Sequence, residues 1–179
     1  MAIVTDWTLD EFLAMPETKP ALEFECGRID QKMSPTTEHS VLQKHLCTLL
    51  DGLAIGEAFP ELRLVLAPEA AKVPDVAFFL NDELPRTPHG RWLRYPEWAP
   101  TVAVEIASPD QDLDELRDKC RFYMREGSRV AILALPETET VEMFSGAAAD
   151  TITTCRGDEL ISDMLTFTPA QIFAVLRPT

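Results

Sequence analysis

The stretch TVAVEIASPD, residues 101–110, has the alternation of a β-strand but holds a carboxylate where the pattern predicts burial. Val102, Val104 and Ile106 share one face, which predicts a strand in the interior of a sheet. Glu105 lies on the other face, between alanines at positions 103 and 107. A buried carboxylate without a partner opposes folding strongly or becomes protonated. Glu105 therefore either has a charged partner or belongs to a functional site.

A second carboxylate occurs in the same setting, in the stretch VPDVAFFL over residues 73–80. Asp75 falls on one face of this predicted strand with Ala77 and Phe79. Two carboxylates on neighbouring apolar strands are suited to a hard divalent cation, because Mg²⁺ is commonly held by one or two carboxylates, waters and a substrate phosphate. The alternative is that each carboxylate pairs with an arginine or caps a loop.

A lysine follows on the next predicted element, the helix DLDELRDKCRFYMREG over residues 112–127. Lys119 borders the apolar stripe of this helix, whereas Arg117 and Arg121 form an outer stripe together with Arg125. A lysine directed at two carboxylates would place positive charge where phosphoryl oxygens gather negative charge. Alternatively, Lys119 follows its own helix out to water.

The remaining patterns predict an α/β domain with a mixed sheet between helices. A capping box at residues 8–11 predicts a short helix to residue 15, and a longer helix is expected from residue 36 or 37 to Gly52 or Gly56. Strands are expected on both sides of a turn at residues 26–27, and over 62–67, 72–80, 101–108, 129–135 and 140–145. Residues 81–100 are expected to form a loop, and a last helix is expected to begin at Pro169.

Composition restricts the classes of function. The chain has 179 residues, 46% of them hydrophobic, and a net charge of −14 from 30 acidic and 16 basic residues. This length predicts a single domain over residues 1–179. The acidic balance disfavours a protein whose whole surface meets nucleic acid, although residues 86–129 are locally balanced in charge. No apolar run approaches a membrane span and no export signal is visible, so we expect a cytoplasmic protein whose four cysteines are reduced.

The loop segment GRWLRYPEW, residues 90–98, is the best candidate for a contact with nucleic acid. Its Arg91, Trp92 and Arg94 could bind phosphates and stack on bases, as Arg117 and Arg121 could bind phosphates from the outer helix face. A loop packed on the core, a subunit interface and a solvated helix face are the alternatives. His39, in the first turn of the second helix, is a candidate base, although histidines at such positions more often pack or begin the helix.

An acidic residue, PD on one strand, E on the next and a lysine on the following helix resemble the PD-(D/E)xK nuclease superfamily. More closely, the chain resembles the Uma-two family of restriction endonucleases. The resemblance spans nearly the full length, in the same order and at similar spacing. It is carried by the segments LEFECGRIDQKMSP, VPDVAFF, VAVEIASPD, ELRDKCRFYMREGSRVAILALPETETVEMF and LTFTPAQIF, and by His39 with the helix that follows it.

The resemblance implies a restriction-endonuclease-like core, a central mixed β-sheet flanked by helices, that uses Mg²⁺ or Mn²⁺ to hydrolyse DNA phosphodiesters. Asp75 and Glu105 would be the metal ligands, Glu23 an accessory acid, and Lys119 the catalytic lysine. Most of the superfamily has this lysine two residues after the glutamate, where this chain has Ala107. Cys26 also replaces an aspartate often seen before the glycine, and residues 129–136 lack the Trp-Asp-Pro ending of relatives.

Three hypotheses remain open at this point. The chain is a metal-dependent DNA endonuclease, a nuclease-fold module that binds a partner without cleaving, or a hydrolase of a smaller phosphate ester. The net charge of −14 favours the second, and the intact Asp75, Glu105 and Lys119 argue against a decayed site. Many relatives of this fold are dimers, so a homodimer is expected.

Overall fold

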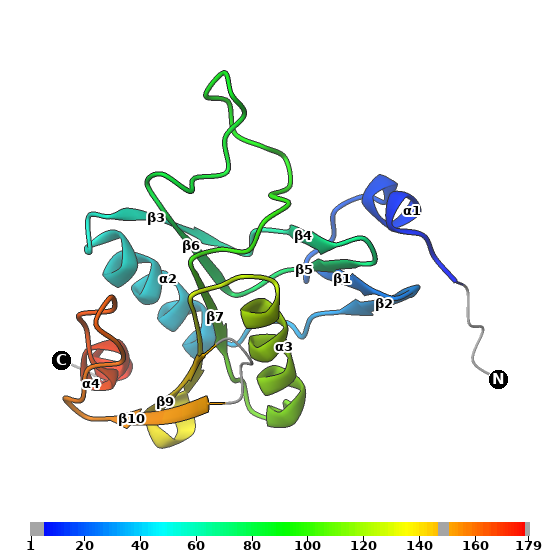
Figure 1. Ribbon diagram of the computed structural model, residues 1–179. Helices are drawn as coiled ribbons and strands as arrows, with labels where there is room; N and C mark the ends of the chain where they lie inside the picture. Colours follow the sequence, from blue (N-terminus) through cyan, green and yellow to red (C-terminus); the bar gives the residue numbers. More distant parts are fainter. Residues whose placement is uncertain (1–5, 147–150, 178–179) are drawn as a thin grey trace.

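The structure is a computed structural model that describes residues 6–146 and 151–177, and it contains two β-sheets (Figure 1). The larger sheet has six strands in the order β10-β9-β8-β7-β6-β3. Their bounds are β3 Gly56–Pro60, β6 Val76–Leu80, β7 Val102–Ile106, β8 Val130–Leu135, β9 Thr140–Ser145 and β10 Thr151–Arg156. β7 and β8 are parallel and the other neighbours antiparallel, so the sheet is mixed as predicted.

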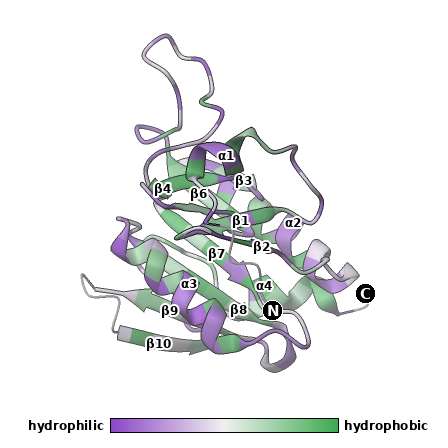
Figure 2. Cartoon of the chain, turned by 90° about the vertical axis from the view of Figure 1, so that its right-hand side faces the viewer, coloured by the Kyte–Doolittle hydropathy of each residue, from purple (hydrophilic) through white to green (hydrophobic). Residues whose placement is uncertain are grey.

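Helices cover both faces of this sheet. α2, Thr37–Asp51, and α4, Pro169–Phe173, lie on one face of the sheet. There Leu42, Leu46 and Phe173 form a buried cluster with Val104 and the other strand residues that point to the same face. α3, Leu113–Arg125, lies on the opposite face and connects the parallel pair β7 and β8. Figure 2 shows the hydrophobic colouring concentrated in the strands between the helices. Side chains of β7 point alternately to the two faces of the sheet. Val102, Val104 and Ile106 therefore face α2, and Glu105 faces α3.

The smaller sheet has the order β2-β1-β5-β4, and it carries part of the site. Its strands are β1 Leu22–Glu25, β2 Arg28–Gln31, β4 Leu64–Ala67 and β5 Ala70–Lys72. The short helix α1, Leu9–Ala14, begins with the predicted capping box at Thr8 and packs Phe12 against Phe24. The turn between β1 and β2 lies at Cys26 and Gly27, both with positive φ, as the sequence predicted.

Residues 72–80 do not form one strand, so that prediction was wrong. β5 ends at Lys72 in the smaller sheet and β6 begins at Val76 in the larger one. Pro74 lies between them and has no N–H to donate to a sheet ladder. As a result Asp75 lies at the junction of the two sheets, one residue before its strand.

Two edge strands, β3 and β10, were missed from the sequence. Gly56, Glu57 and Pro60 give β3 a weak strand signal, and the strand forms because it pairs with β6. At Gly56 an added Cβ would lie 2.1 Å from the carbonyl oxygen of Phe79, so this edge requires glycine. β10 shows no period of two in its burial, because only Cys155 of its six residues is buried.

The segment 81–100 is a long loop, as predicted, with an isolated bridge between Arg86 and Trp92. The last helix begins at Pro169 after Thr168, whose side chain completes a capping box with Gln171. The four cysteines are free thiols. Over the described residues, no helix has both the length and the hydropathy of a membrane span.

Candidate active site

Glu105, the carboxylate in the buried strand β7, has two partners on α3. Its Oε1 lies 2.9 Å from Lys119 Nζ and accepts a hydrogen bond of 2.9 Å from the Tyr123 hydroxyl. Lys119 and Tyr123 are one helical turn apart, so both reach the same strand position. Glu105 is 1% exposed, and these contacts offset part of the cost of burying its charge. Lys119 thus points at the sheet and not along its helix to water.

Asp75 is held by donors from three segments. The Ile106 N–H donates to Asp75 Oδ2 at 2.7 Å, and His39 Nε2 lies 3.1 Å from the same oxygen. Lys32 Nζ donates to Oδ1 at 2.6 Å. Because Asp75 bonds to the main chain of β7 next to Glu105, the two carboxylates predicted as a pair lie at neighbouring positions of the sheet.

Glu23, on β1, connects the smaller sheet to this pair. Its Oε1 lies 2.9 Å from Lys119 Nζ and accepts a hydrogen bond of 2.8 Å from the Val73 N–H. Lys119 therefore bridges Glu23 and Glu105, which come from different sheets. All four predicted site residues, Glu23, Asp75, Glu105 and Lys119, are brought into one cluster.

Two residues of this cluster were missed or given little weight from the sequence. Lys32, just after β2, also donates to the Val73 carbonyl at 2.8 Å, and it carried no periodic signal because it lies outside a strand. His39 was weighed as a packing residue, and the structure does place it in the first turn of α2, with its N–H capped by Thr36. Its ring nevertheless contacts Asp75, and Nδ1 has no hydrogen-bond partner among the described residues.

Burial and the lysines set the charge states of the group in opposite directions. Burial raises the pKa of Glu105, and Lys119 only partly counters this. Burial also acts to raise the pKa of Asp75, but Lys32 and His39 outweigh it and hold that pKa well below its ordinary range. The pKa of Glu23 is likewise lowered, since Lys119 and Lys32 outweigh burial. The carboxylates, despite burial, raise the pKa of Lys32 and Lys119, so both amines are charged.

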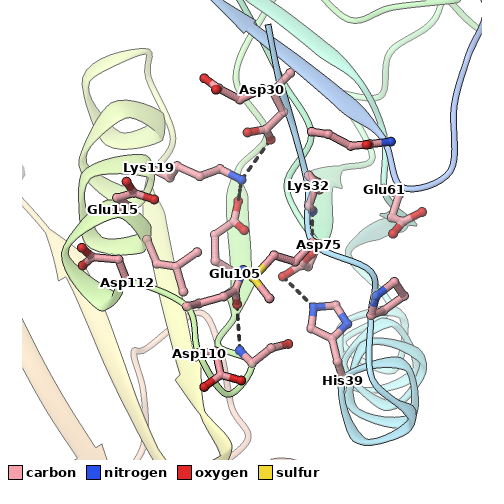
Figure 3. Close-up of a pocket in the computed structure, with 17 residues that line it drawn as sticks. Asp30, Lys32, His39, Glu61, Asp75, Glu105, Asp110, Asp112, Glu115 and Lys119 are labelled. Carbon is pink, nitrogen blue, oxygen red and sulfur yellow. Dashed lines mark hydrogen bonds and ion pairs between the residues drawn. The ribbon is translucent and has the colours of Figure 1, made fainter.

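A cavity of about 360 Å³ opens onto this cluster (Figure 3). The cluster residues Glu23, Lys32, His39, Asp75, Glu105 and Lys119 all line it. Its mouth is acidic, because five exposed carboxylates also line it: Asp30, Glu61, Asp110, Asp112 and Glu115. An anionic substrate therefore meets like charges at the mouth before it reaches the two lysines.

The five candidate nucleic-acid contacts do not line this cavity. In the loop 81–100, Trp92 is 47% exposed and has Arg86 stacked over its ring, while Arg94 lies over Tyr95. On α3, Arg117 binds Glu142 through two nitrogens, at 2.7 and 2.8 Å, and Arg121 binds Asp118 at 2.7 Å. Arg117 and Arg121 of the outer stripe are thus already paired with acids of the same chain.

The donor set fits a divalent cation that takes two ligands from the protein. In the described residues, no group of three or more His, Cys, Asp or Glu side chains is arranged to hold a metal ion. Asp75 and Glu105 remain as a pair, and both contacts to Glu105 fall on Oε1, with no donor from residues 6–146 or 151–177 on Oε2. Two carboxylates with one open oxygen facing a cavity match the usual demand of Mg²⁺, which keeps several waters.

The mixed sheet brings two carboxylates and a lysine of the following helix together at one cavity, and a solved structure of a nuclease-like fold shares this architecture. The chain belongs to the Uma2 family, since the family model described as "Uma2: Putative restriction endonuclease" matches residues 9–172. Its fold is also that of a crystal structure of a putative nuclease belonging to DUF820 from Anabaena variabilis, with a TM-score of 0.86. The two chains are 28% identical, and the match covers 96% of this chain and 99% of that one. A comparison with curated proteins found no match.

Proposed function

We propose that the chain is a metal-dependent endonuclease that hydrolyses DNA phosphodiester bonds. The observation that carries this proposal is the cluster of Asp75, Glu105 and Lys119 at the floor of an open cavity. Family membership supports the same reaction class. Asp75 and Glu105 would hold Mg²⁺ or Mn²⁺, which when bound supplies a Lewis acid for the phosphate and lowers the pKa of water.

Lys119 would stabilise negative charge on the phosphate during the reaction. Its ammonium lies between Glu23 and Glu105 at 2.9 Å from each, so its position is fixed before substrate arrives. A charge held in place in a buried site contributes more than a mobile one in water, because no reorganisation is needed. Glu23 would act as the accessory acid that keeps Lys119 in this position.

Contacts to DNA away from the cleaved bond would come from the loop 81–100 and the outer face of α3. The candidates are Arg91, Trp92 and Arg94 on the loop and Arg117 and Arg121 on the helix. The exposure of Trp92 and of the loop arginines supports the first group. The acidic mouth makes such outlying contacts necessary, because the cavity itself offers only two lysines to a polyanion.

The proposal is tested by nicking of supercoiled plasmid in Mg²⁺ or Mn²⁺. Asp75→Asn and Glu105→Gln keep the shape of each side chain and remove its charge, so we expect each to lower the nicking rate at least about 100-fold. Asp163→Asn is the matched control, since it removes an exposed carboxylate that does not line the cavity and should nick at the wild-type rate. Unchanged nicking by both site variants would refute the assignment.

A second candidate function is hydrolysis of a smaller phosphodiester, and the acidic mouth favours it. A small ester carries one negative charge to the cavity, whereas duplex DNA brings neighbouring phosphates against the five mouth carboxylates. Hydrolysis of bis(p-nitrophenyl) phosphate by wild type, combined with intact plasmid under the same conditions, would support this function over DNA cleavage. A nuclease-fold module without catalysis would leave both substrates intact.

We further propose that the protein acts in the cytoplasm as a homodimer. The free thiols support a reducing compartment, since none of the four cysteines is paired. The edge strand β10, whose outer residues are exposed, offers a surface on which a second copy could pair. Light scattering on the purified chain tests the dimer, and a monomer mass at micromolar concentration would contradict it.

A further inference from the structure

Lys32 occupies a position beside Asp75 that the proposed function leaves without a role. Its ammonium lies 2.6 Å from Asp75 Oδ1 and 2.8 Å from the Val73 carbonyl oxygen. The side chain is 14% exposed, so water supplies little of its solvation. The Val73 carbonyl fixes the amine independently of Asp75, because it belongs to the main chain that joins the two sheets.

We infer that Lys32 is a built-in cation that takes the place of a second metal ion, so that the site binds a single divalent cation. This inference rests on the proposed metal-dependent function, and it adds the number of ions and the residue that sets it. Lys32 would act as a positioning residue through Asp75, whose Oδ1 it binds at 2.6 Å.

The hydrogen bonds of Asp75 leave room for one further partner. A carboxylate offers about four acceptor positions. Lys32 fills one on Oδ1, and the Ile106 N–H and His39 fill two on Oδ2. Glu105 has both of its contacts on Oε1. One open position on Asp75 and the open Oε2 of Glu105 suffice for one shared ion and not for two.

The charge of the buried group leads to the same number. A carboxylate that binds a metal ion is deprotonated, so Glu23, Asp75 and Glu105 count as three negative charges against the two ammonium groups of Lys32 and Lys119. The group then carries a net charge of −1. One divalent cation brings this to +1, which the single negative charge of a phosphodiester neutralises. Two divalent cations would leave +2 after the phosphodiester binds, in a place where uncompensated charge is costly. This count covers the buried groups alone, since the five mouth carboxylates are exposed to solvent.

The contacts of Lys32 agree with this role, since its ammonium pairs with Asp75 Oδ1 and its side chain is only 14% exposed. His39 does not compete with Lys32 for Oδ1 of Asp75, because His39 contacts Oδ2. The two lysines therefore have separate tasks. Lys119 forms ion pairs with Glu105 and Glu23, whereas the ion pair of Lys32 is with Asp75.

The test is the number of Mn²⁺ ions bound per chain, measured by the loss of the free Mn²⁺ signal in electron paramagnetic resonance. We expect one ion in the wild-type protein and two in Lys32→Met. The methionine leaves Asp75 Oδ1 without its ammonium partner and makes the net charge of the buried group more negative by one. Lys72→Met is the matched control. Lys72 is a similarly buried lysine, with a side chain 11% exposed, that pairs with Glu25 and does not line the cavity. The Lys72→Met protein should therefore bind one ion, like the wild type.

Two ions in the wild type, or one ion in Lys32→Met, would overturn the inference and leave the metal-dependent function standing. No bound Mn²⁺ in the wild type would overturn both, and the plasmid assay identifies that case separately. Circular dichroism establishes that the variants are folded. If Lys32→Met does not fold, Lys32→Gln is measured in its place, since it keeps a donor for the Val73 carbonyl, and the same second ion is expected.

Discussion

The two faces of α3 carry ion pairs of opposite kinds. On the inner face, Lys119 binds Glu23 and Glu105, which are 11% and 1% exposed at their side chains. On the outer face, Arg121 binds Asp118, which is 75% exposed, and Arg117 binds Asp114 and Glu142. The outer pairs neutralise arginines that the sequence offered as phosphate contacts. The inner pairs leave an excess of negative charge that a cation can take up.

Charge pairing thus separates a lysine shared by two buried carboxylates from two arginines whose partners include exposed acids on the same helix. Exposed pairs contribute about 0–1 kcal/mol to folding. Buried groups are more sensitive, because removal of one partner leaves a charge without solvent. Changes on the inner face should therefore alter both stability and metal binding. Changes on the outer face should leave metal binding unaltered and should cost less stability the more exposed the pair is.

The largest effect is expected from Lys119→Met. This change leaves Glu23 and Glu105 buried without their shared cation, so we expect the free energy of unfolding to fall by about 3–5 kcal/mol. Urea denaturation measures it. The double variant with Glu105→Gln should recover part of the loss, and equal stability of the single variant and wild type would remove the distinction between the faces.

Asp75→Asn is expected to destabilise the protein somewhat less, by about 3 kcal/mol at pH 7, since asparagine still accepts from the Ile106 N–H. The effect should depend on pH. The pKa of Asp75 is lowered from its ordinary value of 3.8, so its stabilisation is complete above pH 3.8 and is lost as the pH falls towards the folded-state pKa. Urea denaturation in EDTA should show the wild-type and variant curves converging below pH 3.8. A gap that widens in acid would contradict this sign.

Arg117→Gln tests the better buried of the two paired arginines on the outer face. The Arg117 side chain is 27% exposed and makes two hydrogen bonds to Glu142, so we expect a loss of about 1.5–3 kcal/mol in the free energy of unfolding. Binding of Mn²⁺ should be unchanged, because Arg117 does not line the cavity. Altered Mn²⁺ binding would show that the two faces communicate.

Arg121→Ala should have the smallest effect, about 0.2–0.5 kcal/mol, because its partner Asp118 lies three residues away in the same helix and is exposed. Thermal unfolding at low and at 0.5 M salt checks this, and the small difference should shrink as salt screens the pair. A loss as large as that of Arg117→Gln would show that exposure does not rank these pairs.

The sequence predicted the carboxylates of the site better than it predicted their setting. Glu105 and Asp75 could be predicted because charges in apolar strands are unusual, and Lys119 because helical spacing placed it beside an apolar stripe. Lys32 could not be predicted, since its partner lies 43 residues away and no local period marks it. The break at Pro74 was visible in the sequence, but its consequence, a change of sheet at Asp75, depends on how the two sheets meet. The strand β3 likewise exists through its pairing with β6 and not through its own composition.

The position of the site at the junction of two sheets has a consequence for local unfolding. Glu23 belongs to one sheet and Glu105 to the other, and the Val73 N–H and carbonyl are bound by Glu23 and Lys32. A ligand held between them would couple the opening of β1 to that of β7. Amide hydrogen exchange in both strands should then slow together on ligand binding, as expected for two strands that open as one cooperative unit.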